Sequence, residues 1–176
     1  IRDLSEIRRM QEDYQTLFRE MLEGFAVHEL LCDAQGKPVD YRFLTVNPAF
    51  ERMIGLPAEE IVGRTVLDIL PGTEASWIET FGRVTLTGEP VFFENYARTL
   101  DKYFEVTAFR SAPGRFAAIF VDVTERQRAV LALRASEERY RRITENMADV
   151  VWVADLNFNV TYVSPSVERL DGESVE

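Results

Sequence analysis

The chain has 176 residues, of which 46% are hydrophobic, enough to build the core of a folded domain. Its 30 Asp and Glu residues outnumber 20 Lys and Arg residues, and the net charge of −10 argues against direct binding to nucleic acid. The single cysteine, Cys32, cannot form an internal disulfide and is typical of a reducing compartment, so we expect a cytoplasmic location.

No apolar run reaches the length that a membrane span requires, and the first residues lack the features of a signal peptide. The chain starts with Ile1 and stops at Glu176, where no helix or strand is expected to end. We therefore interpret it as an excerpt that makes no direct membrane contact itself. Any membrane anchor of the full-length protein would lie outside it.

The first half of the chain predicts a helix, a hairpin and a block of short helices. Apolar residues at steps of three and four indicate an amphipathic helix over about Leu4–Leu22. Two β-rich runs, Phe25–Cys32 and Val39–Val46, are separated by turn-forming residues and predict a hairpin. Asn47 and Thr65, both of residue types preferred as N-caps, then mark the starts of short helices.

The following segments predict a longer helix, three strands and a second long helix. Apolar residues at helical spacing indicate a helix over Glu74–Leu86. The β-rich runs Val91–Arg98, Lys102–Ser111 and Arg115–Val123 suit an antiparallel meander. A long helix starting at Thr124 carries apolar or small residues at the alternating four- and three-residue steps of a coiled coil.

Two parts of the sequence recur. Tyr140–Met147 aligns with Tyr14–Met21 at an offset of 126 residues, and Val163–Pro165 aligns with Val46–Pro48 at an offset of 117 residues. Matches that preserve the order of helix, hairpin and capped helix indicate a tandem repeat. We assign the nine-residue difference to a longer turn in the first hairpin. The second copy stops before any counterpart of the meander.

Three motifs, in this order, resemble the PAS family: Val46-Asn-Pro-Ala-Phe50, Gly55-Leu-Pro-Ala-Glu-Glu-Ile-Val-Gly63 and Asp122-Val-Thr124. The resemblance spans about residues 14–124, with the second copy at roughly 140–176. It implies an α+β fold in which short helices cover one face of a five-stranded antiparallel sheet. The long amphipathic helices would flank this sheet.

The resemblance also implies a domain organisation. It divides the chain into an N-terminal signalling helix at 1–22, a complete PAS-like domain at 23–124, a linker helix at 125–147 and the truncated start of a second domain at 148–176. Members of the family typically serve as sensor or dimerisation modules in bacterial histidine kinases, diguanylate cyclases and related regulators. We therefore expect a sensory region that forms homodimers through its long helices and has no catalytic activity of its own.

The sequence lacks the common signatures of enzymes and metal sites. It contains no Gly-rich phosphate loop, no His-Glu-x-x-His and no Gly-x-Ser-x-Gly elbow. With one histidine, His28, and one cysteine, a site with several soft metal ligands is not expected. Strand alternation puts His28, Leu30 and Cys32 on one face of the first strand, where we expect a structural, hydrogen-bonded histidine.

The resemblance bears on cofactors as well. Haem-binding members of the family ligate through a histidine on the helix before the meander, and the helix Glu74–Leu86 contains none. Members that form a flavin adduct carry an Asn-Cys-Arg motif on a short helix, whereas Cys32 lies on a strand. Haem and a covalently reacting flavin are therefore disfavoured, and the identity of any cofactor is left open.

A pocket between the sheet and the short helices is the expected place for a small ligand. Arg98 could pair with a carboxylate if its side chain faces inward, and solvent exposure is the alternative for it. Side-chain packing within the core is the alternative for the two large apolar residues of the set. The candidate lining residues are Trp77, Phe81, Asn95, Tyr96, Arg98, Tyr103 and Thr107.

Asp122 and Thr124 lie where the last strand meets the long helix, so we expect them to relay a change at the sheet toward the next module. Two functional hypotheses follow. The first is a ligand-binding sensory module. The second is a structural dimerisation and relay module whose core is filled by its own side chains.

Overall fold

The computed structural model describes residues 4–146, 150–164 and 167. Contacts between residues divide the chain into two compact units, Ile1–Thr124 and Glu125–Glu176. Met147 and the segment 168–172, which belong to the predicted repeat, lie outside the described residues. Among the described residues, no helix is both long enough and apolar enough to cross a bilayer.

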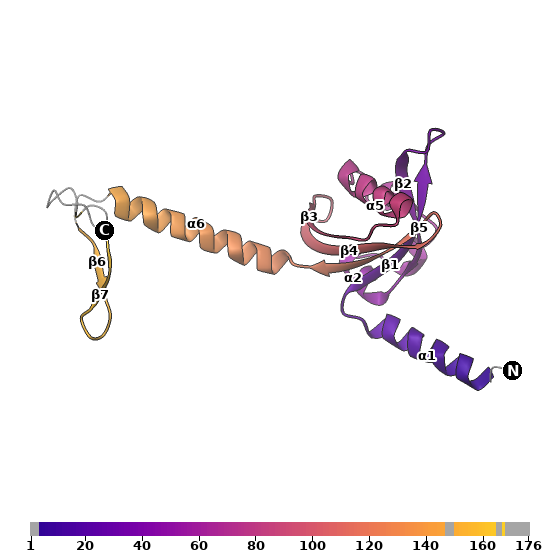
Figure 1. Cartoon of the computed structure of the whole chain (residues 1–176), viewed down its shortest axis with the longest axis horizontal. Coiled ribbons are helices and arrows are strands. Elements are labelled where there is room, and N and C mark those ends of the chain that lie inside the picture. Colours follow the sequence, from indigo (N-terminus) through magenta and orange to yellow (C-terminus); the bar gives the residue numbers. More distant parts are fainter. Residues whose placement is uncertain (1–3, 147–149, 165–166, 168–176) are drawn as a thin grey trace. The chain divides into compact units, whose positions relative to one another are not determined.

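The first unit is built on one five-stranded antiparallel sheet with the strand order β2-β1-β5-β4-β3 (Figure 1). Each strand lies within one residue of a predicted run, so the five predicted strands are confirmed. The central strand, β5, pairs with β1 of the hairpin and with β4 of the meander. The strands are β1 (Gly24–Cys32), β2 (Pro38–Val46), β3 (Val91–Ala97), β4 (Lys102–Ala112) and β5 (Arg115–Asp122).

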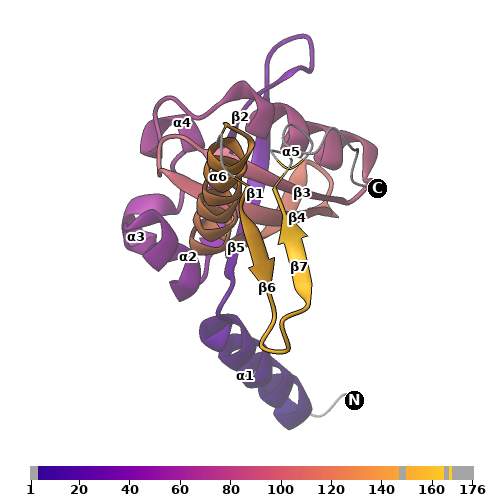
Figure 2. The same cartoon turned by 90° about the vertical axis from the view of Figure 1, so that its left-hand side faces the viewer.

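Four of the helices of the first unit cover one face of this sheet (Figure 2). The longest of them, α5, crosses β2, β1, β5 and β4, whereas α2, α3 and α4 lie over β1 and β2. The bounds are α1 (Leu4–Glu20), α2 (Pro48–Ile54), α3 (Ala58–Ile61), α4 (Val66–Ile69) and α5 (Ala75–Thr87). The predicted α+β architecture, with short helices on one face of the sheet, is therefore confirmed.

Strand alternation decides which side chains enter the core between the sheet and these helices. Val106 and Ala108 of β4 are paired with Phe120 and Ala118 of β5, so all four lie on the same face. All four are buried, and Phe81 of α5 packs into the same cluster with no exposed surface. Burial of this apolar surface is the main force that holds α5 on the sheet.

Asn47 connects the start of α2 to the start of β1. Its Oδ1 accepts a hydrogen bond from the backbone N–H of Phe50 at 2.9 Å, which confirms the predicted N-cap. The same oxygen accepts from the backbone N–H of Phe25 at 2.8 Å, and Nδ2 donates to the carbonyl oxygen of Glu23 at 2.9 Å. Because Asn47 is fully buried, these three bonds replace those that water would make.

The part of the chain after Thr124 contains helix α6 (Thr124–Asn146) and a hairpin of β6 (Trp152–Ala154) and β7 (Val160–Val163). Ser164 follows this hairpin as Asn47 follows the first. The backbone N–H of Val151 donates to Ser164 Oγ at 2.9 Å, and the N–H of Ser164 donates to the carbonyl of Val151 at 2.7 Å. The equivalent bonds join Phe25 and Asn47, which supports the tandem repeat.

The turns of the two hairpins have the same conformation. Asp33 Oδ1 accepts from the backbone N–H groups two and four residues later, both at 2.9 Å, and Asp155 Oδ1 does the same at 2.8 and 2.9 Å. The third residue after the aspartate has a positive φ in both, +78° at Gly36 and +65° at Phe158. The prediction of a longer first turn is therefore wrong. The extra residues lie in β1 and β2, which have nine residues each, against three and four in β6 and β7.

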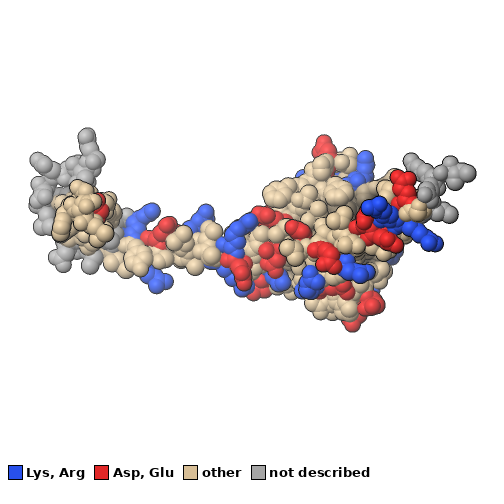
Figure 3. Space-filling view, turned by 90° about the horizontal axis from the view of Figure 1, so that it is seen from below, with Lys and Arg blue, Asp and Glu red and all other residues tan. Residues whose placement is uncertain are grey.

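The molecular surface shown in Figure 3 carries acidic and basic side chains interspersed with one another. The acidic pair Glu59 and Glu60 on α3 is exposed, which agrees with a solvated helix face.

Candidate ligand cavity

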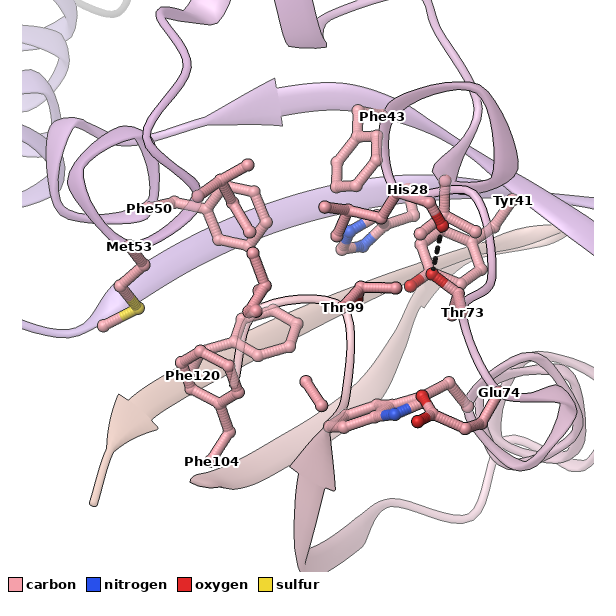
Figure 4. Close-up of a pocket in the computed structure, with 16 residues that line it drawn as sticks. His28, Tyr41, Phe43, Phe50, Met53, Thr73, Glu74, Thr99, Phe104 and Phe120 are labelled. Atoms are coloured by element: carbon pink, nitrogen blue, oxygen red, sulfur yellow. Dashed lines mark hydrogen bonds between the residues drawn. The ribbon is translucent and has the colours of Figure 1, made fainter. Parts of the chain in front are cut away.

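A cavity of about 50 Å³ lies in the first unit between the sheet and the helices (Figure 4). Because roughly 10–15 Å³ of such space holds one water molecule, the cavity has room for a few waters or for a molecule of a few heavy atoms. Its walls are mostly aromatic and aliphatic, with four polar residues among them. The lining residues are Tyr41, Phe43, Phe50, Trp77, Phe104, Phe120, Met53, Ile54, Val66, Leu70, Ala97, Leu100, His28, Thr73, Glu74 and Thr99.

His28 is the most deeply buried polar residue of this lining, with no exposed surface. Its imidazole stacks on Phe116, with ring centroids 4.4 Å apart, and its nitrogens point into the group of side chains drawn in Figure 4. Neither nitrogen has a partner of good hydrogen-bond geometry among the described residues, so the expected hydrogen bond is reduced to a weak contact with the backbone of Phe116. Burial lowers the pKa of His28 to about 3, and the nearby backbone of Phe116 opposes this shift only in part.

Tyr41 packs against His28 with their rings nearly perpendicular and their centroids 5.1 Å apart. Burial, with a smaller effect from the charge of Asp40, raises the pKa of the Tyr41 phenol. Both rings are therefore uncharged at neutral pH. They present polar atoms to the cavity without presenting charge.

Glu74 brings the only carboxylate to the lining residues. Its Oε1 accepts from the backbone N–H of Arg98 at 3.3 Å and lies 3.7 Å from Arg98 Nε. Its Oε2 is buried and has no hydrogen-bond partner among the described residues. A buried carboxylate oxygen without a donor is costly, so this atom marks a place where a ligand could bind.

The structure brings only one of the seven predicted lining residues to this cavity, Trp77. Trp77 is 5% exposed and contacts Phe81 and Phe93 with ring centroids 5.9 and 5.4 Å away. Phe81 is fully buried and stacks on Phe116 at 4.7 Å, so it belongs to the packed core rather than to the cavity wall. Phe81 therefore packs within the core, which was the alternative to lining the pocket.

Three of the other candidates lie on the opposite face of the sheet. Tyr103 and Thr107 have the opposite parity to the buried residues of β4, and Tyr96 is paired with Tyr103. The rings of Tyr96 and Tyr103 are 4.8 Å apart, and the Tyr96 hydroxyl donates to Asp101 Oδ1 at 2.5 Å. Strand pleating therefore removes Tyr96, Tyr103 and Thr107 from the cavity.

The last two candidates are held by local contacts. Asn95 accepts at Oδ1 from the backbone N–H of Tyr96 at 2.9 Å and is not part of the cavity wall. Arg98 follows the end of β3, and its side chain is 80% exposed beside Glu74. Solvent exposure, the alternative considered for Arg98, is what the structure shows, and this residue pairs with a carboxylate of the protein itself.

Sequence reasoning missed His28 and Glu74 as cavity residues. Strand alternation groups His28 with Leu30 and Cys32 but does not say which face enters the core, and the structure buries the face that carries Ala26 and His28. Glu74 sits at the start of α5, where an acidic residue is common and attracts no notice. No group of three or more His, Cys, Asp or Glu side chains that could hold a metal ion occurs among the described residues.

Asp122 and Thr124 are joined at the end of β5. The Thr124 hydroxyl donates to Asp122 Oδ1 at 2.6 Å and accepts from the backbone N–H of Tyr103 at 3.0 Å. Asp122 Oδ2 also lies 3.0 Å from Lys102 Nζ. Partial burial acts to raise the pKa of the Asp122 carboxyl, but the bonds from Thr124 and Lys102 outweigh it and hold the pKa below its ordinary value. These contacts link the end of β5 to the start of β4.

Known proteins resemble both the fold and the sequence of this chain. A domain of a sensory box sensor histidine kinase/response regulator from Geobacter sulfurreducens is 23% identical and matches with a TM-score of 0.47, covering 66% of this chain and 96% of that domain. An RNA-binding Light-Oxygen-Voltage receptor is 19% identical, with a TM-score of 0.52, over 73% of this chain and 37% of the receptor. The latter likeness supports the same fold.

A curated relative, protein y4lL of Sinorhizobium fredii, is 30% identical over 171 residues, covering 88% of this chain. The chain spans 21% of that relative's length. A family model described as PAS fold matches residues 39–128, and a second, described as PAS domain, matches residues 138–172. The chain therefore belongs to the PAS domain family, with two matches that are separated by residues 129–137.

Proposed function

We propose that this chain is a sensory module that binds a small molecule in the cavity of the first unit. The observation that carries this proposal is the pair of buried polar groups without a partner of good hydrogen-bond geometry, His28 and Glu74 Oε2, in the wall of a mostly apolar cavity. Buried polar atoms without partners are rare in proteins because they cost free energy. A ligand that supplies the missing partners would recover that free energy on binding.

Asp122 and Thr124 would transmit the conformational change produced by binding from the sheet to the start of α6. Phe104 and Phe120 line the cavity on β4 and β5, and the bonds of Thr124 connect the ends of the same two strands. Thr124 is also the first residue of α6, so a shift between these strands would act directly on the start of that helix. For the full-length protein we expect a histidine kinase or diguanylate cyclase as the output domain, and no catalysis in this region.

Thermal unfolding in the presence of small molecules tests the proposal. The fraction of a bacterial lysate below the size of proteins should raise the melting temperature of the wild type. Ala97→Val adds two methyl groups to a cavity residue that is 8% exposed, and it should reduce this effect. Ala112→Val, also on the meander but outside the cavity wall, is the matched control. Equal responses of all three proteins would refute binding in the cavity.

A second function, homodimerisation through the long helices, is favoured by the surface of α1. Four of its apolar side chains at helical spacing are largely exposed: Ile7 (48%), Met10 (68%), Tyr14 (61%) and Leu17 (69%). Pairing of two such helices would remove this surface from water. Sedimentation analysis should show a dimer that Met10→Glu with Leu17→Glu dissociates. A monomeric wild type would exclude this function.

A further inference from the structure

The unpartnered polar atoms of the cavity are mainly hydrogen-bond acceptors. Glu74 Oε2 is a carboxylate oxygen, which accepts hydrogen bonds and carries negative charge. His28 is uncharged, because burial lowers its pKa to about 3, so one of its ring nitrogens accepts and the other donates. A ligand beside Glu74 Oε2 must therefore bring N–H or O–H donors, and positive charge favours it there.

The apolar walls of the cavity also suit a cation. Six aromatic side chains line it, and two of them, Tyr41 and Trp77, have the more electron-rich rings. The faces of such rings attract cations, and the attraction grows when the cation is removed from water. The net charge of −10 adds a long-range field that draws cations toward the protein.

The guanidinium group of Arg98 does not serve as the cation that binds Glu74 Oε2 in the cavity. It approaches Glu74 through Oε1, at 3.7 Å, and its side chain remains 80% exposed. Oε2 is left on the buried side of the same carboxylate. The carboxylate thus has one oxygen turned to a surface cation and one without a donor.

We propose that the cavity selects a small organic cation that carries N–H groups, of the amidinium or alkylammonium class, over neutral and anionic molecules of the same shape. This inference rests on the proposed function, since it names the chemical class of the molecule that the cavity binds. Glu74 Oε2 accepts from the cation, and the aromatic side chains enclose the remainder. The cavity volume of about 50 Å³ limits the ligand to a few heavy atoms.

Three planar probes of four heavy atoms separate charge from shape: acetamidinium, acetamide and acetate. Each is titrated into the full 176-residue chain at constant ionic strength, and the indole N–H signals of the two tryptophans are followed by NMR. The Trp77 indole belongs to the cavity wall, whereas Trp152 lies in the other unit and is 61% exposed. Acetamidinium should shift the Trp77 signal saturably and leave that of Trp152 unchanged.

A pair of matched variants tests the role of the carboxylate. Glu74→Gln keeps the size of the side chain and removes its charge, and it should weaken acetamidinium binding by about tenfold or more. Glu79→Gln makes the same change at an exposed position of α5 outside the cavity wall, and it should leave the affinity unchanged. Equal losses in the two variants would overturn the assignment of Glu74, because the effect would then come from net charge alone.

The remaining outcomes separate this inference from the proposed function. If acetamide or acetate binds as tightly as acetamidinium, the preference for a cation is wrong and small-molecule binding stands. If no probe shifts the Trp77 signal but lysate molecules still stabilise the wild type more than Ala97→Val, the cation inference again fails while the proposed function stands. The proposed function itself fails if lysate molecules do not bind the wild-type cavity.

Discussion

Asn47 and Phe25 are joined by two hydrogen bonds, from the N–H of Phe25 to Asn47 Oδ1 at 2.8 Å and from the N–H of Asn47 to the carbonyl of Phe25 at 3.0 Å. Ser164 and Val151 form the same pair of bonds after the second hairpin. In both hairpins a polar side chain that follows the second strand accepts a hydrogen bond from the backbone at the start of the first strand. The two copies of the repeat thus share individual hydrogen bonds as well as sequence motifs.

Replacing Asn47 should strongly destabilise the first unit. Asn47→Ala leaves the N–H groups of Phe25 and Phe50 and the carbonyl of Glu23 without their side-chain partner, and we expect a loss of about 2–3 kcal/mol in the free energy of unfolding. Asn47→Ser, the residue that the second copy uses, should lose less because its hydroxyl can still cap. Urea denaturation measures both. Equal stability of the two variants would contradict this account of the cap.

The hairpin turn should depend on the residue at its positive-φ position. Gly36 has φ +78° and open space around its Cα, so Gly36→Ala tests backbone conformation without a steric clash. We expect it to lower the free energy of unfolding by about 1 kcal/mol. Lys37→Ala in the same turn is the control. A Gly36→Ala variant as stable as the control would show that the turn adopts another conformation in solution.

His28 should make the first unit sensitive to acid. Its pKa is about 3 in the folded state and 6.5 as the ordinary value, so only the unfolded chain takes up this proton between these pH values. Stability from this source is therefore present above pH 6.5 and is lost as the pH falls toward 3. Between pH 7 and pH 5 the loss should be about 2 kcal/mol.

The variant His28→Phe isolates this effect, because phenylalanine keeps the stack on Phe116 and cannot be protonated. Carboxyl groups such as Asp122 also change stability with pH, but they are the same in both proteins and cancel in the comparison. Urea denaturation at the two pH values should show a smaller loss for His28→Phe than for the wild type. Parallel losses would mean that His28 does not stay buried and neutral.

Asp122 and Thr124 should be energetically coupled. Thr124→Val removes the hydroxyl that bonds both Asp122 and the backbone of Tyr103, and Asp122→Ala removes its acceptor. In a double-mutant cycle we expect a coupling energy of about 1 kcal/mol. Lys102→Met, which removes only the ion pair with Asp122, should couple less to Thr124→Val. Strictly additive losses would exclude a shared network at the end of β5.

The elements of the fold were accessible from sequence because they rest on local patterns. Alternating apolar residues in Lys102–Ala112 and helical spacing in Ala75–Thr87 act over a few residues, and these bounds were predicted within one residue. The strand order depends instead on contacts between distant segments. The pairing of β1 with β5 has no local signal in the sequence, and it was not predicted.

The candidate site was predicted less well than the fold, for a physical reason. Polar residues of the meander were chosen without fixing the face of each strand, although the apolar Phe104, Val106 and Ala108 already indicate that Tyr103 and Thr107 face away from the core. The polar groups of the cavity lie elsewhere, at His28 and Glu74, and only packing in three dimensions brings these two segments together.

Native mass spectrometry of the chain after incubation with the small-molecule fraction of a lysate tests the central claim most directly. The account predicts a wild-type protein that carries one additional small mass, released on unfolding, and an Ala97→Val variant that carries less of it. The mass of the bare chain in both proteins would contradict ligand binding in the cavity and leave dimerisation and relay as the function of this module.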